Sequence, residues 1–352
     1  MKNIAKIFLF ILKITAILNA TALLMSITAC YINPSTYWIF QLFGLFFPVI
    51  FTVNIIAVII LVAIKSKVAY FNLAIFIISV FFAGRFFQFS GNKTDSENAV
   101  KVISYNVHDF KSIDNYYKTT YDEIADFLLA EDADIICLQE YVLNSNELNK
   151  YKILQKLYQK YKYTSDNYGG QKIFSKYPFE KKQKFNLAGA CIVFADININ
   201  GKTVRTYSCH LQSTRFNPDG TQQRLTSKNA NYKKELKRVA VNLRDAFIKR
   251  SKQIELIAAE ISKSKYPAIV CGDFNDTPMS YSYQKIKGKM KDTFIEAGSG
   301  MSNTYKKLFS FLRIDYIFID KNISTLEYRV AKEIKYSDHY PVIVKFKIND
   351  EK

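Results

Sequence analysis

The sequence predicts an α/β domain preceded by three transmembrane helices, and two observations lead to this fold class. Residues 1–89 consist mostly of long apolar segments and contain six basic and no acidic residues. From about residue 101 onward, short β-rich runs alternate with helical stretches, and the expected strands outnumber the helices. We therefore expect a membrane domain over residues 1–88, a linker over 89–100 and an α/β domain over 101–350.

The membrane domain is expected from three apolar segments, which run from about Ile7 to Cys30, Trp38 to Ile64 and Val68 to Gly84. A helix that crosses the hydrocarbon core of a bilayer needs about 20 apolar residues, with a range of about 17–25. All three segments reach this length, the third only just. A cleaved signal peptide would explain the first segment alone.

Basic residues are distributed unevenly around these segments. Lys2 and Lys6 precede the first segment, Lys65 and Lys67 separate the second from the third, and residues 31–37 have none. Because short loops rich in Lys and Arg stay in the cytoplasm, the N-terminus is expected inside. Three crossings would then place the α/β domain outside the cytoplasmic membrane, in the periplasm if the cell has an outer membrane. In the alternative topology the third segment does not cross, and the domain is cytoplasmic.

The linker and the elements of the α/β domain follow from local composition. Residues 89–100 (FSGNKTDSENAV) are mostly small, polar and charged, as is typical of a linker. Strands are expected over 101–107, 134–139, 171–175, 191–199, 203–209, 267–271, 314–319 and 341–348. Helices are expected over about 119–131, 145–160 and 232–263. The longest helix is amphipathic, with basic residues between apolar ones at Val239, Leu243, Phe247, Ile254 and Ile257.

The charge balance narrows the class of partner. The chain has 49 basic and 31 acidic residues, and residues 90–352 carry a net charge of +12. This charge suits an anionic partner such as a phosphate ester, a nucleic acid or a membrane surface, and equally suits a basic soluble domain. The basic stretch 228–252 could grip a polyanion, although a solvated helix face is the simpler interpretation. None of the five cysteines forms a CxxC pair, which argues against a zinc or redox motif. No protein partner is predicted.

Polar side chains gather where the expected strands end. They are Asn106 in ISYNVHDF, Glu140 in DIICLQE, His210 in TYSCHLQS, Asp273 and Asn275 in CGDFNDTP, Asp315 in RIDYIF, and Asp338 and His339 in SDHYPV. Each motif alone has a simple structural explanation, such as a solvated carboxylate or a turn favoured by Gly, Asp and Asn. Together they indicate a catalytic site, because α/β folds place such groups at strand ends beside loops.

In this order, the motifs YN, QE, HL, GDFN, ID and SDH resemble those of the endonuclease/exonuclease/phosphatase family, over roughly residues 100–348. The three leading apolar segments are similar to a membrane-bound branch of that family. The resemblance implies a four-layer α/β sandwich, in which two mixed sheets pack face to face with helices outside. It also implies Mg²⁺-dependent hydrolysis of a phosphate ester by a phosphodiesterase, nuclease or phosphatase, with Mn²⁺ as an alternative ion.

The resemblance implies metal-binding roles for three residues. Glu140 would be the principal ligand of the ion, Asn106 would lie beside it, and Asp338 would help to hold the metal or to position phosphate. These side chains offer the hard oxygen ligands that Mg²⁺ requires.

Five further residues would carry catalysis. Asp273 would orient or deprotonate the attacking water, and Asn275 would help to hold that water or a phosphate oxygen. His339 would contact the scissile phosphate, oriented by the Asp315 carboxylate at about 2.6–3.2 Å. His210 would be a second phosphate contact or the acid for the leaving group.

The sequence also departs from parts of the family. Abasic-site nucleases typically have a Lys soon after the Glu and a Trp before the Asn, whereas Glu140 is followed by Tyr141 and Tyr105 precedes Asn106. A role in DNA repair is therefore in doubt, and nucleic acid, phospholipid head groups and inositol phosphates all stay open as substrates. Tyr168, before a Gly-Gly pair, is expected to contact the substrate. The alternative function is a non-catalytic membrane-anchored binding module, which the complete set of motifs disfavours.

Overall fold

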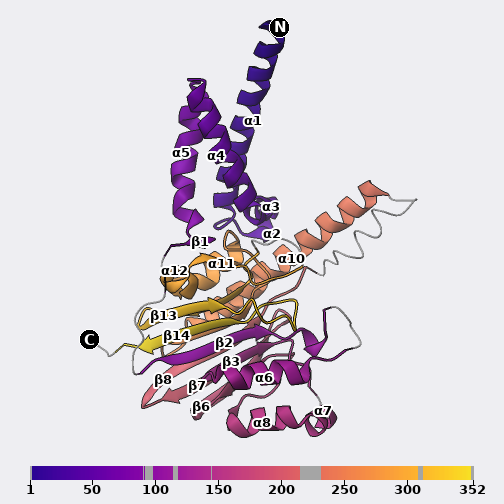
Figure 1. Ribbon diagram of the computed structural model, residues 1–352, viewed down its shortest axis with the longest axis vertical. Coiled ribbons are helices and arrows are strands. Elements are labelled where there is room, and N and C mark those ends of the chain that lie inside the picture. The colour runs from indigo at the N-terminus through magenta and orange to yellow at the C-terminus, as the bar shows by residue number, and fades with distance from the viewer. Residues whose placement is uncertain are drawn as a thin grey trace.

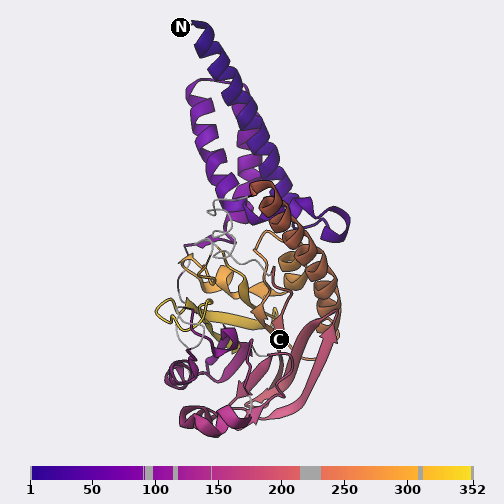
Figure 2. The same cartoon turned by 90° about the vertical axis from the view of Figure 1, so that its right-hand side faces the viewer.

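The computed structural model describes residues 2–89, 91, 98–113, 118–143, 145–214, 231–307 and 312–349. It consists of an N-terminal helical module that stands on an α/β domain (Figure 1). The long axis of the molecule runs along the helices of the module, and the two sheets of the domain lie at the opposite end (Figure 2).

The domain contains two mixed six-stranded sheets. The first has the order β10-β12-β9-β8-β7-β6. Its strands are β10 (Lys291–Asp292), β12 (Asp315–Ile319), β9 (Ala268–Asp273), β8 (Lys202–His210), β7 (Ala190–Ile199) and β6 (Phe179–Leu187). The second has the order β13-β14-β2-β3-β5-β4. Its strands are β13 (Ile323–Val330), β14 (Val342–Ile348), β2 (Val100–Asn106), β3 (Ile135–Gln139), β5 (Lys172–Ser175) and β4 (Tyr163–Thr164). In each sheet one central pair is parallel, β8 with β9 and β2 with β3.

Three apolar cores separate the layers. The core between the sheets contains Val and Ile side chains from both, such as Val102 and Val193. A second core lies between the β2 sheet and helices α6 (Tyr121–Glu131) and α8 (Lys152–Lys160). A third lies between the β8 sheet and helices α10 (Tyr232–Ile261) and α11 (Tyr281–Lys287). The predicted arrangement of two mixed sheets flanked by helices is therefore confirmed.

The sequence located most of these elements. All eight expected strands are present within a few residues, and the expected helix over 145–160 is divided into α7 (Ser145–Lys150) and α8. Strands β6 and β13 were not expected, nor were α11, α12 (Thr293–Ala297), the 3₁₀ turn η1 (His108–Phe110) and the two-residue pair β1 (Phe87–Gln88) and β11 (Gly300–Met301). Most of the expected linker, residues 90 and 92–97, lies outside the described residues.

The N-terminal module contains α1 (Lys2–Thr28), α2 (Pro34–Tyr37), α3 (Ile39–Leu45), α4 (Phe47–Ala63) and α5 (Val68–Ala83). Only α1 is long and apolar enough to cross a membrane by itself within the described chain. A second span is possible only if α3 and α4, which meet at 69°, act as one broken segment, and α5 has only 16 residues. The prediction of three complete spans is therefore wrong.

Two physical causes explain this correction. Pro48 lies in the first turn of α4, where its missing N–H costs nothing, so the apolar run from Trp38 to Ile64 divides just before it. The 16 residues of α5 extend about 24 Å at 1.5 Å per residue, short of the roughly 30 Å hydrocarbon core.

Helices α1, α4 and α5 nevertheless lie side by side in both views (Figures 1 and 2). Asn54 of α4 donates its side-chain amide to the side-chain oxygen of Asn72 of α5 at 3.1 Å, and both side chains are buried. The outer surface of the bundle is largely apolar and exposed, as at Phe8 and Phe81. Buried amide bonds within a bundle and apolar side chains outside it are typical of helices packed in lipid.

An arginine near the end of α5 fixes the module to the domain. The Arg85 guanidinium donates to the carbonyl oxygen of Pro278 at 2.9 Å and to the side-chain oxygen of Gln284 at 3.0 Å. In return, buried Arg313 donates to the Arg85 carbonyl oxygen at 2.8 Å and pairs with buried Asp292 at 2.8 Å. Hydrogen bonds from an arginine on each side thus join the module to the domain.

Helix α3 makes the closest backbone approach in this interface. A Cβ atom added at Gly44 would lie 2.4 Å from the Met279 carbonyl oxygen, so a larger residue would force the two segments apart. The Gln41 side-chain oxygen accepts from the Tyr281 N–H at 3.2 Å. The module therefore packs against the segment 276–284, which directly follows one of the expected catalytic motifs.

Candidate active site

The strand register brings the expected site residues of the β8 sheet together. His210 pairs with Asp273 across the parallel strands β8 and β9, and Asp273 pairs with Asp315 across the antiparallel strands β9 and β12. In the other sheet Asn106 pairs with Gln139, the residue before Glu140. Since strand partners are about 5 Å apart, the backbone ladder itself sets the spacing of these side chains.

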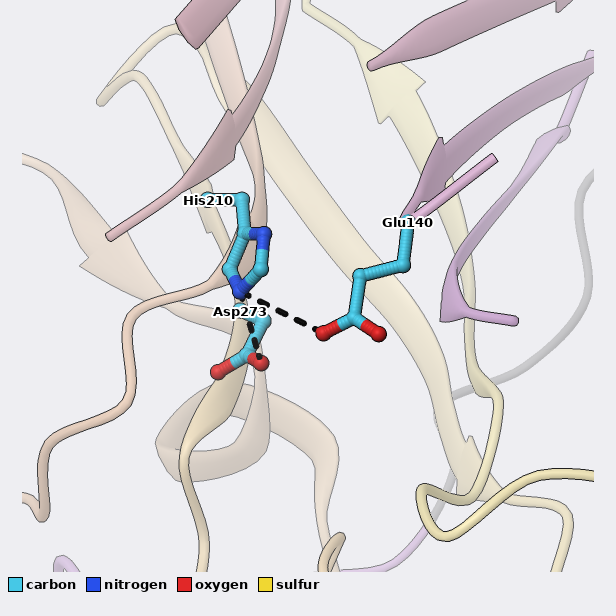
Figure 3. A group of neighbouring side chains, drawn as sticks. All are labelled: Glu140, His210 and Asp273. Atoms are coloured by element: carbon cyan, nitrogen blue, oxygen red, sulfur yellow. Dashed lines mark ion pairs between the residues drawn. The ribbon is translucent and has the colours of Figure 1, made fainter. Parts of the chain in front are cut away.

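Side chains from the two sheets converge in one cluster. His210 Nε2 lies 3.6 Å from Glu140 Oε1 and 3.6 Å from Asp273 Oδ2, and Figure 3 shows the imidazole pointing at both carboxylates. Asn106 bridges the sheets, because its amide nitrogen donates to Glu140 Oε1 at 2.9 Å and to Asp273 Oδ2 at 3.1 Å.

A glycine turn supports the backbone of Glu140, which has a positive φ of 51°. The Tyr141 N–H donates to the Gly170 carbonyl oxygen at 2.9 Å. A Cβ atom added at Gly170 would lie 3.1 Å from the Glu140 Cα, so the turn fits closely only because this residue is glycine. Since Gly170 also has a positive φ of 79°, two conformational reasons favour glycine at this position.

Tyr168 lies outside the cluster formed by the other expected site residues. Its ring packs against the core between the sheets, with the Lys184 ammonium 5.5 Å from the ring centroid, and it does not line the cleft described below. Substrate contact by Tyr168 therefore stays a prediction, whereas the backbone of Gly170 lies against Glu140.

Asp273 is buried and surrounded by donors. Its Oδ1 accepts from the Asn275 N–H at 2.8 Å, and its Oδ2 accepts from the Asn275 side-chain amide at 3.2 Å. Burial raises the pKa of Asp273 to about 6, an effect that the charge of His339 opposes and that of Asp315 reinforces. A carboxylate with this pKa can accept a proton near neutral pH.

His339 and Asp315 form the pair expected from the sequence. The two side chains are buried, and His339 Nδ1 lies 2.9 Å from Asp315 Oδ2, within the predicted range. His339 Nε2 points the other way and lies 3.6 Å from Asp273 Oδ2. Burial alone would lower the pKa of His339, but the charges of Asp315 and Asp273 raise it to about 10. The imidazolium form is therefore the one that faces the cleft.

A third histidine, which the sequence did not single out, joins the site. His108 Nδ1 lies 3.7 Å from Glu140 Oε2 and 3.4 Å from Asp338 Oδ1. Burial would raise the pKa of Glu140, but a hydrogen bond from His108, the charge of His210 and the Asn106 amide hold it at about 2. Asp338 also faces Lys307, whose Nζ lies 3.4 Å from Oδ2. The sequence feature that could have identified His108 as a site residue is its position in YNVHDF, two residues after Asn106.

The donor set suits a hard divalent cation. Ligand atoms of Glu140, His210 and Asp273 all lie within 4.8 Å of one another. His210 Nε2 is buried without a hydrogen-bond partner among the described residues, although it faces two carboxylates. Carboxylate oxygens favour Mg²⁺ or Mn²⁺. The amide oxygen of Asn106 instead accepts from the His108 N–H at 3.0 Å, so its role as a ligand stays a prediction, as does that of Asp338.

These groups open into a cleft of about 660 Å³. Its polar lining includes His108, Glu140, Asp273, Asn275, Lys307, Asp338 and His339. Its apolar lining includes Leu45 and Phe46 of the module, Val239, Leu243 and Phe247 of α10, and Leu312 and Ile314. A cavity of this size with convergent polar groups is typical of a site for a small molecule or a small part of a larger one.

Solved structures with this fold cover most of the domain. An endonuclease/exonuclease/phosphatase from Bacteroides vulgatus aligns with 18% identity and a TM-score of 0.52, covering 72% of this chain and 100% of that one. A family protein from Bacteroides thetaiotaomicron aligns with 18% identity and a TM-score of 0.51, covering 72% and 98%. TDP2 of D. rerio, complexed with a single-strand DNA product, aligns with 15% identity and a TM-score of 0.50, covering 71% and 100%. At these identities the likeness establishes the fold alone.

Sequence comparison assigns each part of the chain separately. No curated protein matches it at a significant level. Residues 5–86 match a domain of unknown function, DUF8431, which covers the helical module. Residues 103–339 match the Endonuclease/Exonuclease/phosphatase family, and this range holds all the residues of the cluster described above. The chain therefore belongs to the endonuclease/exonuclease/phosphatase family.

Proposed function

We propose that the protein is a metal-dependent hydrolase of phosphate esters, with a membrane domain over residues 1–88 and a catalytic domain over 101–350. The observation that carries this proposal is the convergence of Glu140, His210 and Asp273, from separate strands of two sheets, in one cluster, of which Glu140 and Asp273 line the cleft. A buried carboxylate, Asp273, and a half-buried one, Glu140, face the same imidazole and serve no evident packing purpose, because apolar residues would avoid the cost of burying charge.

The residues divide the work of hydrolysis between them. Glu140, which the surrounding donors keep ionised, and Asp273 would hold Mg²⁺ or Mn²⁺, with Asn106 and Asp338 as further candidates. A bound divalent cation neutralises charge on the phosphoryl oxygens and the departing oxygen. Losing a positioned donor to such oxygens typically costs about 10²–10³ in rate.

The other side chains transfer protons and orient the groups that contact the phosphate. Asp273 receives the proton of the attacking water, and Asn275 holds that water or a phosphoryl oxygen. Asp315 orients His339, whose protonated Nε2 binds the scissile phosphate. His210, which contacts both carboxylates of the cluster, protonates the leaving oxygen.

Replacement of Glu140 by Gln tests the proposal. The variant keeps the volume of the side chain and removes the charge, so Mg²⁺-dependent release of p-nitrophenol from a soluble phosphodiester should fall at least a hundredfold. Glu180→Gln, on the exposed edge strand β6, is the matched control and should hydrolyse the ester at the parental rate. Hydrolysis by Glu140→Gln at the parental rate, with or without chelator, would show that the metal assignment is wrong. The absence of hydrolysis by the parent protein itself would favour the alternative of a non-catalytic, membrane-anchored binding module.

We further propose that α1 anchors the protein in the cytoplasmic membrane with the catalytic domain outside. Lys2, Lys6 and Lys13 lie in the first half of α1, and the domain docks at the other end of this helix. By the positive-inside rule, one crossing by α1 carries the domain out of the cytoplasm, whether or not α4 and α5 reach the other face. A C-terminal alkaline phosphatase fusion should be active and a green fluorescent protein fusion dark, and the reverse result would place the domain inside.

A further inference from the structure

The apolar part of the cleft lining is continuous with the membrane module. Phe46 lies at the break between α3 and α4, at the end of the helical bundle that faces the domain. Phe46 and Leu45 line the same cavity as Glu140 and His339. The catalytic groups and the domain-facing end of the helical bundle therefore line one cavity.

Helix α10 supplies the opposite apolar wall. Its residues Tyr232, Leu236, Val239, Leu243 and Phe247 follow one another at spacings of three or four, so they occupy one face of the helix. The last three line the cleft, whereas Tyr232 and Leu236 are 61% and 68% exposed. At 1.5 Å per residue this stripe is about 22 Å long and leads from the exposed start of the helix to the catalytic groups.

Helix α10 contacts the module through its C-terminal half, and its N-terminal half projects sideways from the domain-facing end of the bundle (Figure 1). Ser251 and Glu255 of α10 contact Ser35 and Asn33 of the module at 3.1 and 2.9 Å. The helix runs from the sheets up to the domain-facing end of the bundle (Figure 2). Its N-terminal half therefore lies at the level where the proposed membrane surface meets the domain.

The charges on the rest of this half-helix are cationic. Lys233, Lys234, Lys237 and Arg238 are exposed, and Glu235 is the acidic residue of the first turn. An apolar face bordered by basic residues is the pattern of a helix that lies in the interface of an anionic membrane. A nucleic acid could also bind the basic residues. It has no long apolar group that would pack against the apolar stripe or against the wall formed by Leu45 and Phe46.

We infer that the substrate is a membrane lipid whose head group carries the phosphate ester. This inference rests on the proposed hydrolase function and names the substrate class of the same site. The apolar part of the lipid lies between Phe46 and the Leu243 face of α10, and its phosphate reaches the Glu140, His210 and Asp273 cluster. The water oxygen bonds to phosphorus and its proton passes to Asp273, while the phosphorus–oxygen bond to the leaving group breaks and that oxygen takes a proton from His210.

Three probes distinguish the lipid from other phosphate esters. The purified full-length protein would be reconstituted into vesicles that contain phosphatidylglycerol, phosphatidylethanolamine or phosphatidic acid, and would separately be given the soluble ester bis(p-nitrophenyl) phosphate or a single-stranded oligonucleotide. We expect kcat/KM to be highest for a vesicle lipid, with products followed by ³¹P NMR.

Substitutions on α10 then test the path of the substrate. Leu243→Gln, in the cleft wall, should lower the ratio of lipid to soluble-ester kcat/KM by roughly tenfold or more, the effect of losing one apolar contact. Leu256→Gln is the matched control, because Leu256 lies on the same helix, is 47% exposed and does not line the cleft. Leu236→Gln, on an exposed position that folding does not depend on, should lower the ratio in the same direction.

The outcomes separate this inference from the function on which it rests. If none of the three probes is hydrolysed with Mg²⁺ or Mn²⁺, the hydrolase proposal fails. If the soluble ester or the oligonucleotide is hydrolysed but no vesicle lipid is, the hydrolase stands and the lipid inference is overturned. A lipid-to-ester ratio that is the same in Leu243→Gln, Leu236→Gln and Leu256→Gln also overturns it.

Discussion

Replacing Asp315 by Asn tests the buried pair that orients His339. Asn keeps the size of the side chain and can still form a hydrogen bond, but it removes the negative charge 2.9 Å from His339 Nδ1. Two unit charges about 4 Å apart interact by about 4 kcal/mol at an effective dielectric constant of about 20. Both side chains are buried, so solvent screens this interaction little.

The loss of this charge interaction should change the pH profile of hydrolysis. In the parent protein the pKa of His339 is raised to about 10, so the imidazolium persists through neutral pH. Its contribution to folding stability is complete below the ordinary histidine pKa of about 6.5 and disappears as the pH rises through about 10. In Asp315→Asn the alkaline limb of the kcat/KM profile should move to lower pH by about three pH units.

The assay is the kcat/KM for a soluble phosphodiester between pH 6 and 10.5, with a thermal melt of each protein at every pH. Asp320→Asn is the matched control, because Asp320 directly follows the other end of β12 and accepts from the Asn322 N–H, a bond that Asn can keep. An alkaline limb at the same pH in Asp315→Asn and the parent would refute the assignment of the imidazolium to catalysis.

Three further changes have definite expected outcomes. His210→Ala should lower kcat about 10²–10⁴-fold at unchanged thermal stability, measured by hydrolysis and a melt. Gly44→Val should loosen the module from the domain, because its Cβ would meet the Met279 carbonyl oxygen at 2.4 Å, and hydrogen exchange at 276–284 should rise. Arg313→Ala leaves buried Asp292 unpaired and should cost about 3–5 kcal/mol in the free energy of unfolding, measured with denaturant.

The glycine and arginine substitutions each have a matched control. Gly91→Val places a side chain where no atom lies within 4 Å, so the exchange rates at 276–284 should stay parental. Arg329→Ala removes a partly exposed ion pair with Glu131 and should cost less than about 1 kcal/mol. Equal destabilisation by the two arginine substitutions, or parental kcat in His210→Ala, would contradict the roles given to these side chains.

Sequence periodicity predicted the buried strands and missed those at the sheet edges. Strands such as β3 are continuous apolar runs, which composition identifies directly. Strand β6, with the sequence FEKKQKFNL, is an edge strand whose charged residues mostly face solvent, so its apolar signal is weak. In the module, length and hydropathy predicted a second span, but the break at Phe46 depends on Pro48 and on docking to the domain.

The site residues were predicted by motif, but their pairing required the fold. Nothing in the sequence places His108 between Glu140 and Asp338, since it follows from the 3₁₀ turn after β2, where His108 has a φ of 50°. Similarly, the close approach of Gly170 to Glu140 follows from the turn before β5 and not from composition. The local sequence shows which residues carry polar groups. Whether each group points into the site depends on the conformation of nearby turns, which is set by long-range packing.

The interlocked arginines at the interface also affect how reaction rates should be measured. Because Arg85 and Arg313 bind across it, the catalytic domain is held at one height and one orientation instead of swinging on a tether. If α1 anchors the protein in a membrane as proposed, an enzyme held in this way would reach a lipid substrate by lateral diffusion in two dimensions. For a lipid substrate, its velocity would then follow the mole fraction of that lipid in the bilayer, and diluting the vesicles in buffer would leave the turnover of each protein molecule unchanged.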